Sequence, residues 1–225
     1  MLVHLPSVLD HATLARLREA LATAGWTDGR ETVGAQGAQV KRNLQLPDAS
    51  PLREALGRDV LAALARHPLY HAAALPLRVL PPRFNRYQGG GEYGFHVDGA
   101  VMALEDGRQL RSDLACTLFL SAPHEYDGGE LVVSDTYGEH AVKLAAGDAV
   151  LYPAGSLHRV TAVTRGARLA AFFWIQSLVR DETRRRTLLE LDTAIQRLVA
   201  GDADTTAVLQ LTGVYHNLLR AWSET

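Results

Sequence analysis

The sequence predicts an α+β fold, in which a double-stranded β-helix (jelly-roll) core is flanked by helices at both ends of the chain. Between residues 75 and 178, about eight short apolar runs alternate with turns rich in Gly, Pro and Asp. Runs of this length and spacing are typical of a sandwich or barrel. Outside this block, apolar residues recur every three or four positions, which indicates amphipathic helices. We therefore expect an N-terminal support region of helices and an edge strand (1–76), a jelly-roll domain (77–178) and a C-terminal helical extension (179–225).

Two helices are expected in the N-terminal region. Asp10 can cap the first helix, and Gly25 is well placed to end it. Ser50 and Pro51 can begin the second helix as its N-cap and its first helical residue.

The segment between these helices is small, polar and rich in Gly. Residues 27–39 are expected to form a mobile loop, either a cover for a site or a plain connection, and residues 40–46 alternate like an edge strand. Further on, His67 and His71 have the spacing of a metal pair on a helix. Because Pro68 lies between them, surface or packing roles are favoured.

The central block supplies the strands of the barrel. We expect strands at 77–80, 83–87, 114–120, 130–134, 140–144, 149–151, 158–163 and 168–175. A jelly roll places strands that are distant in sequence opposite one another in two facing sheets. The single cysteine, Cys116, lies in an apolar run and is expected to be a buried core thiol.

Two amphipathic helices are expected after residue 178. The first begins at Asp181 and ends at Gly201, and the second runs from about Asp204 to Trp222. Bracing of the barrel is the favoured role, and a homo-oligomer interface is the alternative. The run Arg184 to Arg186 is interpreted as a solvated helix face.

Composition excludes several classes of protein. The chain has 225 residues, a net charge of −2 and one cysteine, so a disulfide scaffold or an iron–sulfur cluster is ruled out. No basic stripe is visible, so no nucleic-acid partner is expected. The N-terminus lacks the pattern of a signal peptide and no apolar run has the length of a membrane span, so we expect a cytoplasmic protein without a membrane partner.

A metal site is indicated by His96 and Asp98. Two residues apart on a strand, their side chains would lie on one face, as two thirds of the 2-His-1-carboxylate triad that holds non-haem Fe(II). This pair alone is weak evidence. His158 follows a predicted hairpin at residues 147–157 and would point from a strand end into the mouth of the barrel, so it is the candidate third ligand.

An anion site is indicated by Arg168. It opens a strand that is apolar on both faces, so its guanidinium needs a partner if it points inward. A dicarboxylate such as 2-oxoglutarate could chelate the iron at one end and pair with Arg168 at the other. A surface arginine in a turn is the alternative. Tyr87 could assist at the distal carboxylate and Tyr93 could line the pocket near the metal, although core roles are common for such aromatics.

Taken together, the motifs resemble the Fe(II)/2-oxoglutarate dioxygenases of the prolyl-4-hydroxylase branch. The resemblance rests on Arg86-Tyr-x-x-Gly-x-x-Tyr-x-x-His96-x-Asp98, Tyr126-Asp-Gly-Gly-Glu-Leu131, Gly147-Asp-x-x-x-Tyr-Pro-x-x-x-x-His158 and Arg168. Length and layout are similar to the bacterial PKHD-type hydroxylases, a group often associated with iron uptake.

This resemblance implies a hydroxylase. It implies Fe(II) on His96, Asp98 and His158, and 2-oxoglutarate on Arg168 with help from Tyr87. It also implies O2 as co-substrate, succinate and CO2 as products, and L-ascorbate as the reductant that maintains the iron. Tyr87 is nine residues before His96, whereas some relatives have ten.

Two other functions stay open at this point. A cupin-like metal-binding or sensing barrel would keep the three ligands but would not need Arg168. A nucleic-acid demethylase is disfavoured by the charge balance. The prime substrate is a prolyl or lysyl residue, a free amino acid or another small metabolite, and its selection is expected to depend on residues 27–46 and 99–112.

Overall fold

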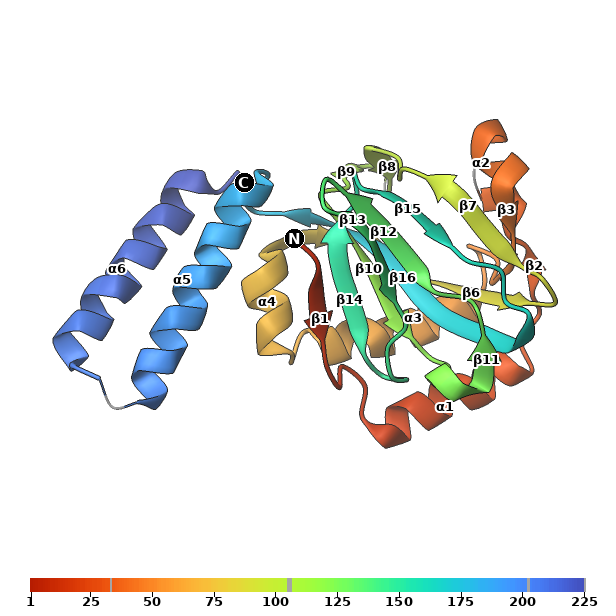
Figure 1. Cartoon of the computed structure of the whole chain (residues 1–225), viewed down its shortest axis with the longest axis horizontal. Coiled ribbons are helices and arrows are strands. Elements are labelled where there is room, and N and C mark those ends of the chain that lie inside the picture. Colours follow the sequence, from red (N-terminus) through yellow and green to blue (C-terminus); the bar gives the residue numbers. More distant parts are fainter. Residues whose placement is uncertain (33, 105–106, 202, 225) are drawn as a thin grey trace.

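The chain forms a mixed helix and sheet fold, seen here in a computed structural model that describes residues 1–32, 34–104, 107–201 and 203–224. Two antiparallel sheets enclose a core, and helices cover one outer face (Figure 1). The larger sheet contains β1 (Val3–Leu5), β14 (Ala149–Pro153), β10 (Leu114–Phe119), β16 (Arg165–Ser177), β6 (Arg83–Gln88), β4 (Leu44–Gln45) and β2 (Thr27–Asp28), with β11 (Tyr126–Asp127) and β5 (Pro76–Val79) beside β16. The smaller sheet contains β13 (Gly138–Val142), β12 (Leu131–Asp135), β15 (Leu157–Val160), β7 (Glu92–His96) and β3 (Lys41–Arg42). A separate hairpin pairs β8 (Val101–Ala103) with β9 (Gln109–Arg111).

The long strand β16 shows how the sequence builds two cores from one sheet. Ala171, Phe173 and Ile175 belong to the apolar core on the outer face of the larger sheet, whereas Phe172 and Trp174 face the core between the sheets. This alternation follows from the two-residue period of a strand. It also turns Arg168, which has the parity of Phe172 and Trp174, toward the space between the sheets.

Helices seal the outer face of the larger sheet. They are α1 (His11–Ala22), α3 (Pro51–Leu64) and α4 (Pro68–Ala74), and their apolar residues join the same buried cluster as the outward residues of the sheet. Asp10 and Ser50 cap α1 and α3, as expected, through hydrogen bonds to the backbone N–H groups of Thr13 and Arg53. α1 has ended at Ala22, before Gly25.

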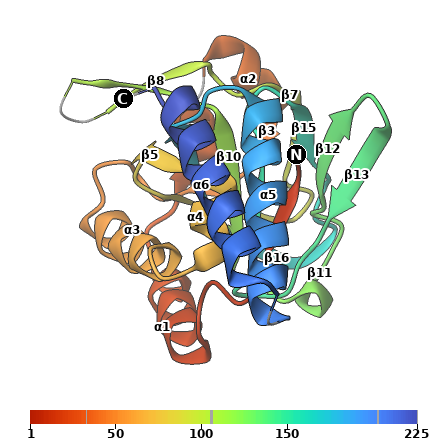
Figure 2. The same ribbon diagram turned by 90° about the vertical axis from the view of Figure 1, so that its left-hand side faces the viewer.

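The C-terminal helices α5 (Glu182–Ala200) and α6 (Thr205–Trp222) form a hairpin that projects from the sheets (Figure 1), and both are seen along their length in Figure 2. Asp181 and Asp204 cap them, as predicted. Contact with the rest of the chain is concentrated at one end of the hairpin, where Trp222 packs beside Leu75, Val179 and Leu188. The hairpin therefore braces the fold at its base rather than along its length.

Several local predictions were wrong. Residues 27–39 form β2, the 3-10 helix η1 (Gly29–Thr32) and helix α2 (Ala35–Val40) rather than a loop; within this segment and the 99–112 segment, residues 33 and 105–106 lie outside the described residues. The expected edge strand at 40–46 is divided between β3 and β4, which join different sheets. The run Arg184 to Arg186 was expected to face solvent, but Arg185 is buried. Its Nη1 donates hydrogen bonds to the carbonyls of Val179 and Arg180 at 2.7 and 2.6 Å.

Other predictions were confirmed. All eight apolar runs form strands, and β7 is an additional one that carries His96. Pro68 begins α4, so His67 and His71 do not share a continuous helix with α3; their Nε2 atoms contact the carbonyls of Pro6 and Ala65. Cys116 is buried, and burial raises the pKa of its thiol. Among the described residues, no helix combines the length and the apolar character needed to cross a bilayer.

Candidate metal centre and its cavity

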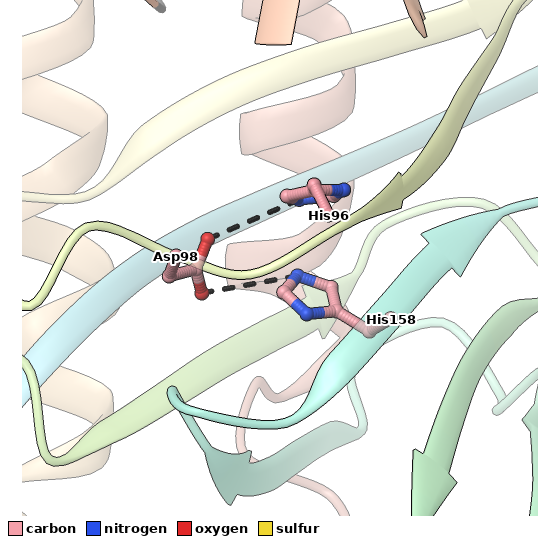
Figure 3. Close-up of side chains that lie close together, drawn as sticks. All are labelled: His96, Asp98 and His158. Carbon is pink, nitrogen blue, oxygen red and sulfur yellow. Dashed lines mark ion pairs between the residues drawn. The ribbon is translucent and has the colours of Figure 1, made fainter. Parts of the chain in front are cut away.

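His96, Asp98 and His158 come together between the two sheets (Figure 3). His96 is the last residue of β7, and antiparallel pairing with β15 places His158 directly opposite it. Asp98 lies two residues beyond the end of β7 rather than on the strand, and the chain turns its carboxylate toward both imidazoles. The ligand atoms of the three residues all lie within 4.8 Å of one another, which is close enough for one ion to contact all of them.

Hydrogen bonds fix which imidazole nitrogen is available. The Nδ1 atoms of His96 and His158 lie 2.8 and 2.9 Å from the carbonyl oxygens of Gly94 and Ser156. A carbonyl only accepts, so each Nδ1 carries a proton, and in the neutral imidazole Nε2 then presents its lone pair. The Nε2 atoms are 3.9 Å (His96) and 3.8 Å (His158) from the Asp98 carboxylate oxygens. This is the tautomer that metal binding needs.

The electrostatics of the site also favour a cation. Burial, with His158 as a neighbour, lowers the pKa of His96 to about 4, so the imidazole stays neutral at pH 7. Burial raises the pKa of Asp98, because a carboxylate is poorly solvated there. A metal ion would remove that penalty by supplying the missing positive charge.

Arg168 lies deeper in the same space, on β16. It is 1 % exposed, and its side chain packs against the rings of Tyr87 and Phe119 at 5.4 and 5.2 Å. Tyr87 is its neighbour because β6 and β16 pair residue for residue there. Among the described residues no carboxylate pairs with Arg168, and its Nε has no hydrogen-bond partner. A buried guanidinium in this state is suited to bind an anion, so Arg168 marks a candidate anion site.

Tyr126 completes this anion site, although sequence reasoning assigned it no role. Its hydroxyl is buried without a partner among the described residues, and Arg168 is close enough to lower its pKa against the effect of burial. Gly129 has φ +69°, and a Cβ there would lie 2.9 Å from the Tyr126 ring and 3.1 Å from Arg168 Cδ. The signal was the Tyr126–Leu131 motif, in which Gly129 makes room for these two side chains.

One cavity of about 1080 Å³ connects the metal ligands with Arg168. This volume is at the upper limit of typical ligand pockets, so it can hold a keto diacid together with part of a second substrate. Tyr93 stacks on His96 with ring centroids 3.6 Å apart, and the Trp174 indole adjoins Asp98. Lys41 and Trp174 line the cavity, and neither was expected from the sequence. Trp174 could have been found from the two-residue period of a strand, because it lies an even number of residues after Arg168 and so on the same face.

The comparisons with known proteins agree with this site. Residues 82–176 match the model of the 2OG-Fe(II) oxygenase superfamily, and residues 182–224 match the PKHD-type hydroxylase C-terminal domain. The chain is therefore an Fe(II)/2-oxoglutarate-dependent oxygenase. A PKHD-type hydroxylase of Stenotrophomonas maltophilia (strain R551-3) is 66% identical over 224 residues, and one of Xylella fastidiosa (strain Temecula1) is 64% identical over 230 residues; each match covers 100% of both chains. The chain belongs to the PKHD-type hydroxylase family.

Solved structures show the same fold at low identity. A Pseudomonas putida prolyl-4-hydroxylase is 20% identical with a TM-score of 0.50, and the match covers 78% of this chain and 92% of that one. HygX from Streptomyces hygroscopicus, with nickel, 2-oxoglutarate and hygromycin B bound, is 18% identical with a TM-score of 0.53, over 78% and 82% of the two chains. Membership of the PKHD-type hydroxylase family identifies the chain as an oxygenase and rules against the alternative function, a cupin-like metal-binding barrel without redox turnover.

Proposed function

We propose that His96, Asp98 and His158 hold Fe(II), and that 2-oxoglutarate binds between this ion and Arg168. The enzyme hydroxylates a C–H bond of a small-molecule or peptidyl substrate, with release of succinate and CO2, and L-ascorbate keeps its iron reduced. The two facing sheets serve as the jelly-roll core. The observation that carries the proposal is one cavity that holds both a preformed 2-His-1-carboxylate set and a buried, unpaired arginine.

The residues of the chain fit these two groups. Each Nδ1 donates to a carbonyl, so Nε2 is the nitrogen left to bind iron, and the lowered pKa of His96 means that no proton has to leave that ring at pH 7. At the other end, Arg168 offers charge-assisted hydrogen bonds and Tyr126 a neutral one, and among the described residues neither Arg168 Nε nor the Tyr126 hydroxyl has a hydrogen-bond partner. Burial raises the pKa of Tyr87 to about 12, so its hydroxyl stays protonated and can donate to the distal carboxylate.

The bound iron supplies the oxidative chemistry, while the protein positions the reactants and excludes water. His96 and His158 are held by their carbonyl partners, so the ligand set is rigid. Arg168, at the buried end of the cavity, fixes the direction in which 2-oxoglutarate lies, with its keto acid end toward the metal ligands.

The first experiment needs no knowledge of the prime substrate. Fe(II) and then 2-oxoglutarate are added to the metal-free protein without oxygen, and the visible spectrum is recorded. A weak charge-transfer band that saturates with 2-oxoglutarate is expected, since the keto acid would chelate the iron. Binding of one Fe(II) per chain without such a band would refute the assigned co-substrate site and the role of Arg168.

A further inference from the structure

A second buried cation lines the cavity. Lys41 is 2 % exposed and is one of only two lysines in the chain, the other being Lys143. Its Nζ donates hydrogen bonds to Thr32 Oγ1 at 3.0 Å and to Gln45 Oε1 at 3.1 Å. An ammonium has three N–H donors, so one is left over. Among the described residues no carboxylate forms an ion pair with Lys41.

The surrounding wall offers further polar groups without partners. Arg83 Nε, Asn85 Oδ1 and both polar atoms of the Asn43 amide are buried and make no hydrogen bond among the described residues, and all three residues line the cavity. The charge of Arg83 is already balanced, because its Nη2 is 2.7 Å from Asp48. Lys41 is therefore the unbalanced charge of this wall, and the Asn43 and Asn85 amides that line the same cavity have polar atoms free for a ligand.

Lys41 lies on the metal side of the cavity rather than at Arg168. Its Nζ is 5.3 Å from the centre of the Tyr93 ring, which in turn stacks on His96. Arg168 instead packs on Tyr87 and Phe119. The two cations thus face different parts of one cavity, and an anion bound to Lys41 would lie one aromatic ring away from a metal ligand.

We propose that Lys41, with the Asn85 amide and Arg83 beside it, binds a carboxylate group of the prime substrate. The inference rests on the proposed function, because it takes Arg168 to be occupied by 2-oxoglutarate. It names the substrate class: a compound with a free carboxylate, such as an amino acid, a peptide C-terminus or an acidic side chain, that reaches the iron from the Lys41 wall.

The charge balance of the cavity favours a substrate that carries a single negative charge. Imidazoles that bind a metal are neutral, Arg83 is balanced by Asp48, and the other charges that line the cavity are those of Asp98, Arg168 and Lys41. Fe(II) and dianionic 2-oxoglutarate cancel each other, and Asp98 offsets one of the two cations. One positive charge remains, which a monocarboxylate neutralises and a phosphate dianion exceeds. Burial, with Arg83 nearby, lowers the pKa of Lys41 to about 8, which is consistent with an ammonium that lacks its counter-ion.

The presence of only two lysines makes a direct test practical. Protein labelled with ¹³C,¹⁵N-lysine gives two side-chain ammonium signals, and Lys143 is the internal control because its Nζ donates to the Tyr126 carbonyl, away from the Lys41 wall. The protein is loaded with Zn(II), which does not broaden the signals, and with saturating 2-oxoglutarate, whose binding is checked by calorimetry. Acetate and benzoate are then titrated against the neutral controls acetamide and benzamide.

A saturable shift of the Lys41 signal by the carboxylates is expected, with Lys143 unmoved and no response to the amides. In Lys41→Met, carboxylate binding measured by calorimetry should weaken about tenfold or more, while Lys143→Met binds like the wild type. A Lys41 signal that ignores all carboxylates, or that responds equally to the amides, would overturn the proposal. So would a shift caused by 2-oxoglutarate alone that leaves no further response. Absence of 2-oxoglutarate binding would instead contradict the proposed co-substrate site.

Discussion

Replacement of Lys41 by methionine should stabilise the metal-free protein at pH 7. A pKa of about 8, instead of the ordinary 10.5, means that the protonated ammonium disfavours the folded state by about 3 kcal/mol at that pH. Methionine keeps an unbranched side chain, one atom shorter, without the charge. The variant loses the hydrogen bonds to Thr32 and Gln45, at about 1–2 kcal/mol together, although the Thr32 hydroxyl can still donate to Gln45 at 3.1 Å. The net gain in the free energy of unfolding should be about 1–2 kcal/mol.

The pH dependence of this difference is the sharper test. Because the folded-state pKa of Lys41 is lowered, the unfolded chain binds the proton more tightly than the folded chain. Wild-type stability should therefore rise relative to the variant between about pH 8 and pH 10.5, while below pH 8 the full penalty applies. By pH 10 less than about 1 kcal/mol of the penalty is left, so the lost hydrogen bonds should make the variant the less stable protein.

Urea unfolding followed by circular dichroism, with a chelator present, measures both proteins at pH 7, 9 and 10. Tyrosines and Cys116 also titrate in this range in the unfolded chain, but both proteins contain them, so their effect cancels in the difference. A stability difference between Lys41→Met and the wild type that is constant from pH 7 to pH 10 would refute the argument that Lys41 is buried as an unpaired ammonium.

Three further predictions concern the proposed site. Asp98→Ala should lose Fe(II) retention and succinate formation together, because the two imidazoles alone make an incomplete ligand set; full turnover would remove Asp98 from the site. Arg168→Met should raise the KM for 2-oxoglutarate by about a hundredfold with Fe(II) binding nearly intact, whereas the exposed Arg186→Met should change neither, and an unchanged KM in the first variant contradicts the assignment. Tyr126→Phe should raise the same KM by about fivefold, since one neutral hydrogen bond is lost; equal kinetics would show that the hydroxyl does not reach the co-substrate.

The metal ligands could be predicted because the information is local. The His-x-Asp spacing and the hairpin before His158 are short-range features, and antiparallel pairing of β7 with β15 does the rest. The detail that was wrong is the position of Asp98, which was expected on a strand and lies just beyond one. Its carboxylate still reaches the imidazoles, because the chain turns after His96.

The Lys41 wall of the cavity could not be predicted in the same way. Residues 27–39 are small, polar and rich in Gly, a composition that is typical of loops, yet they form β2, η1 and α2. Residues 40–46 were expected to form one edge strand, but tertiary pairing divides them between β3 and β4 in different sheets. Only that pairing turns Lys41 inward beside Tyr93. Arg185 illustrates the same limit, since a run of arginines normally indicates solvent and only the fold brings the backbone carbonyls that bury one of them.

The two unpaired cations suggest how the site combines selectivity with marginal stability. Burial of Arg168 and Lys41 without carboxylates disfavours the ligand-free fold, and ligands that neutralise them restore stability by mass action. An uncharged analogue of either ligand would leave a buried cation unpaired, so the cavity rejects it more strongly than a lost hydrogen bond alone would. If Arg168 and Lys41 bind these ligands as proposed, discrimination comes from groups that the protein leaves unsatisfied. The gain in stability and the loss of carboxylate binding in Lys41→Met then have the same cause.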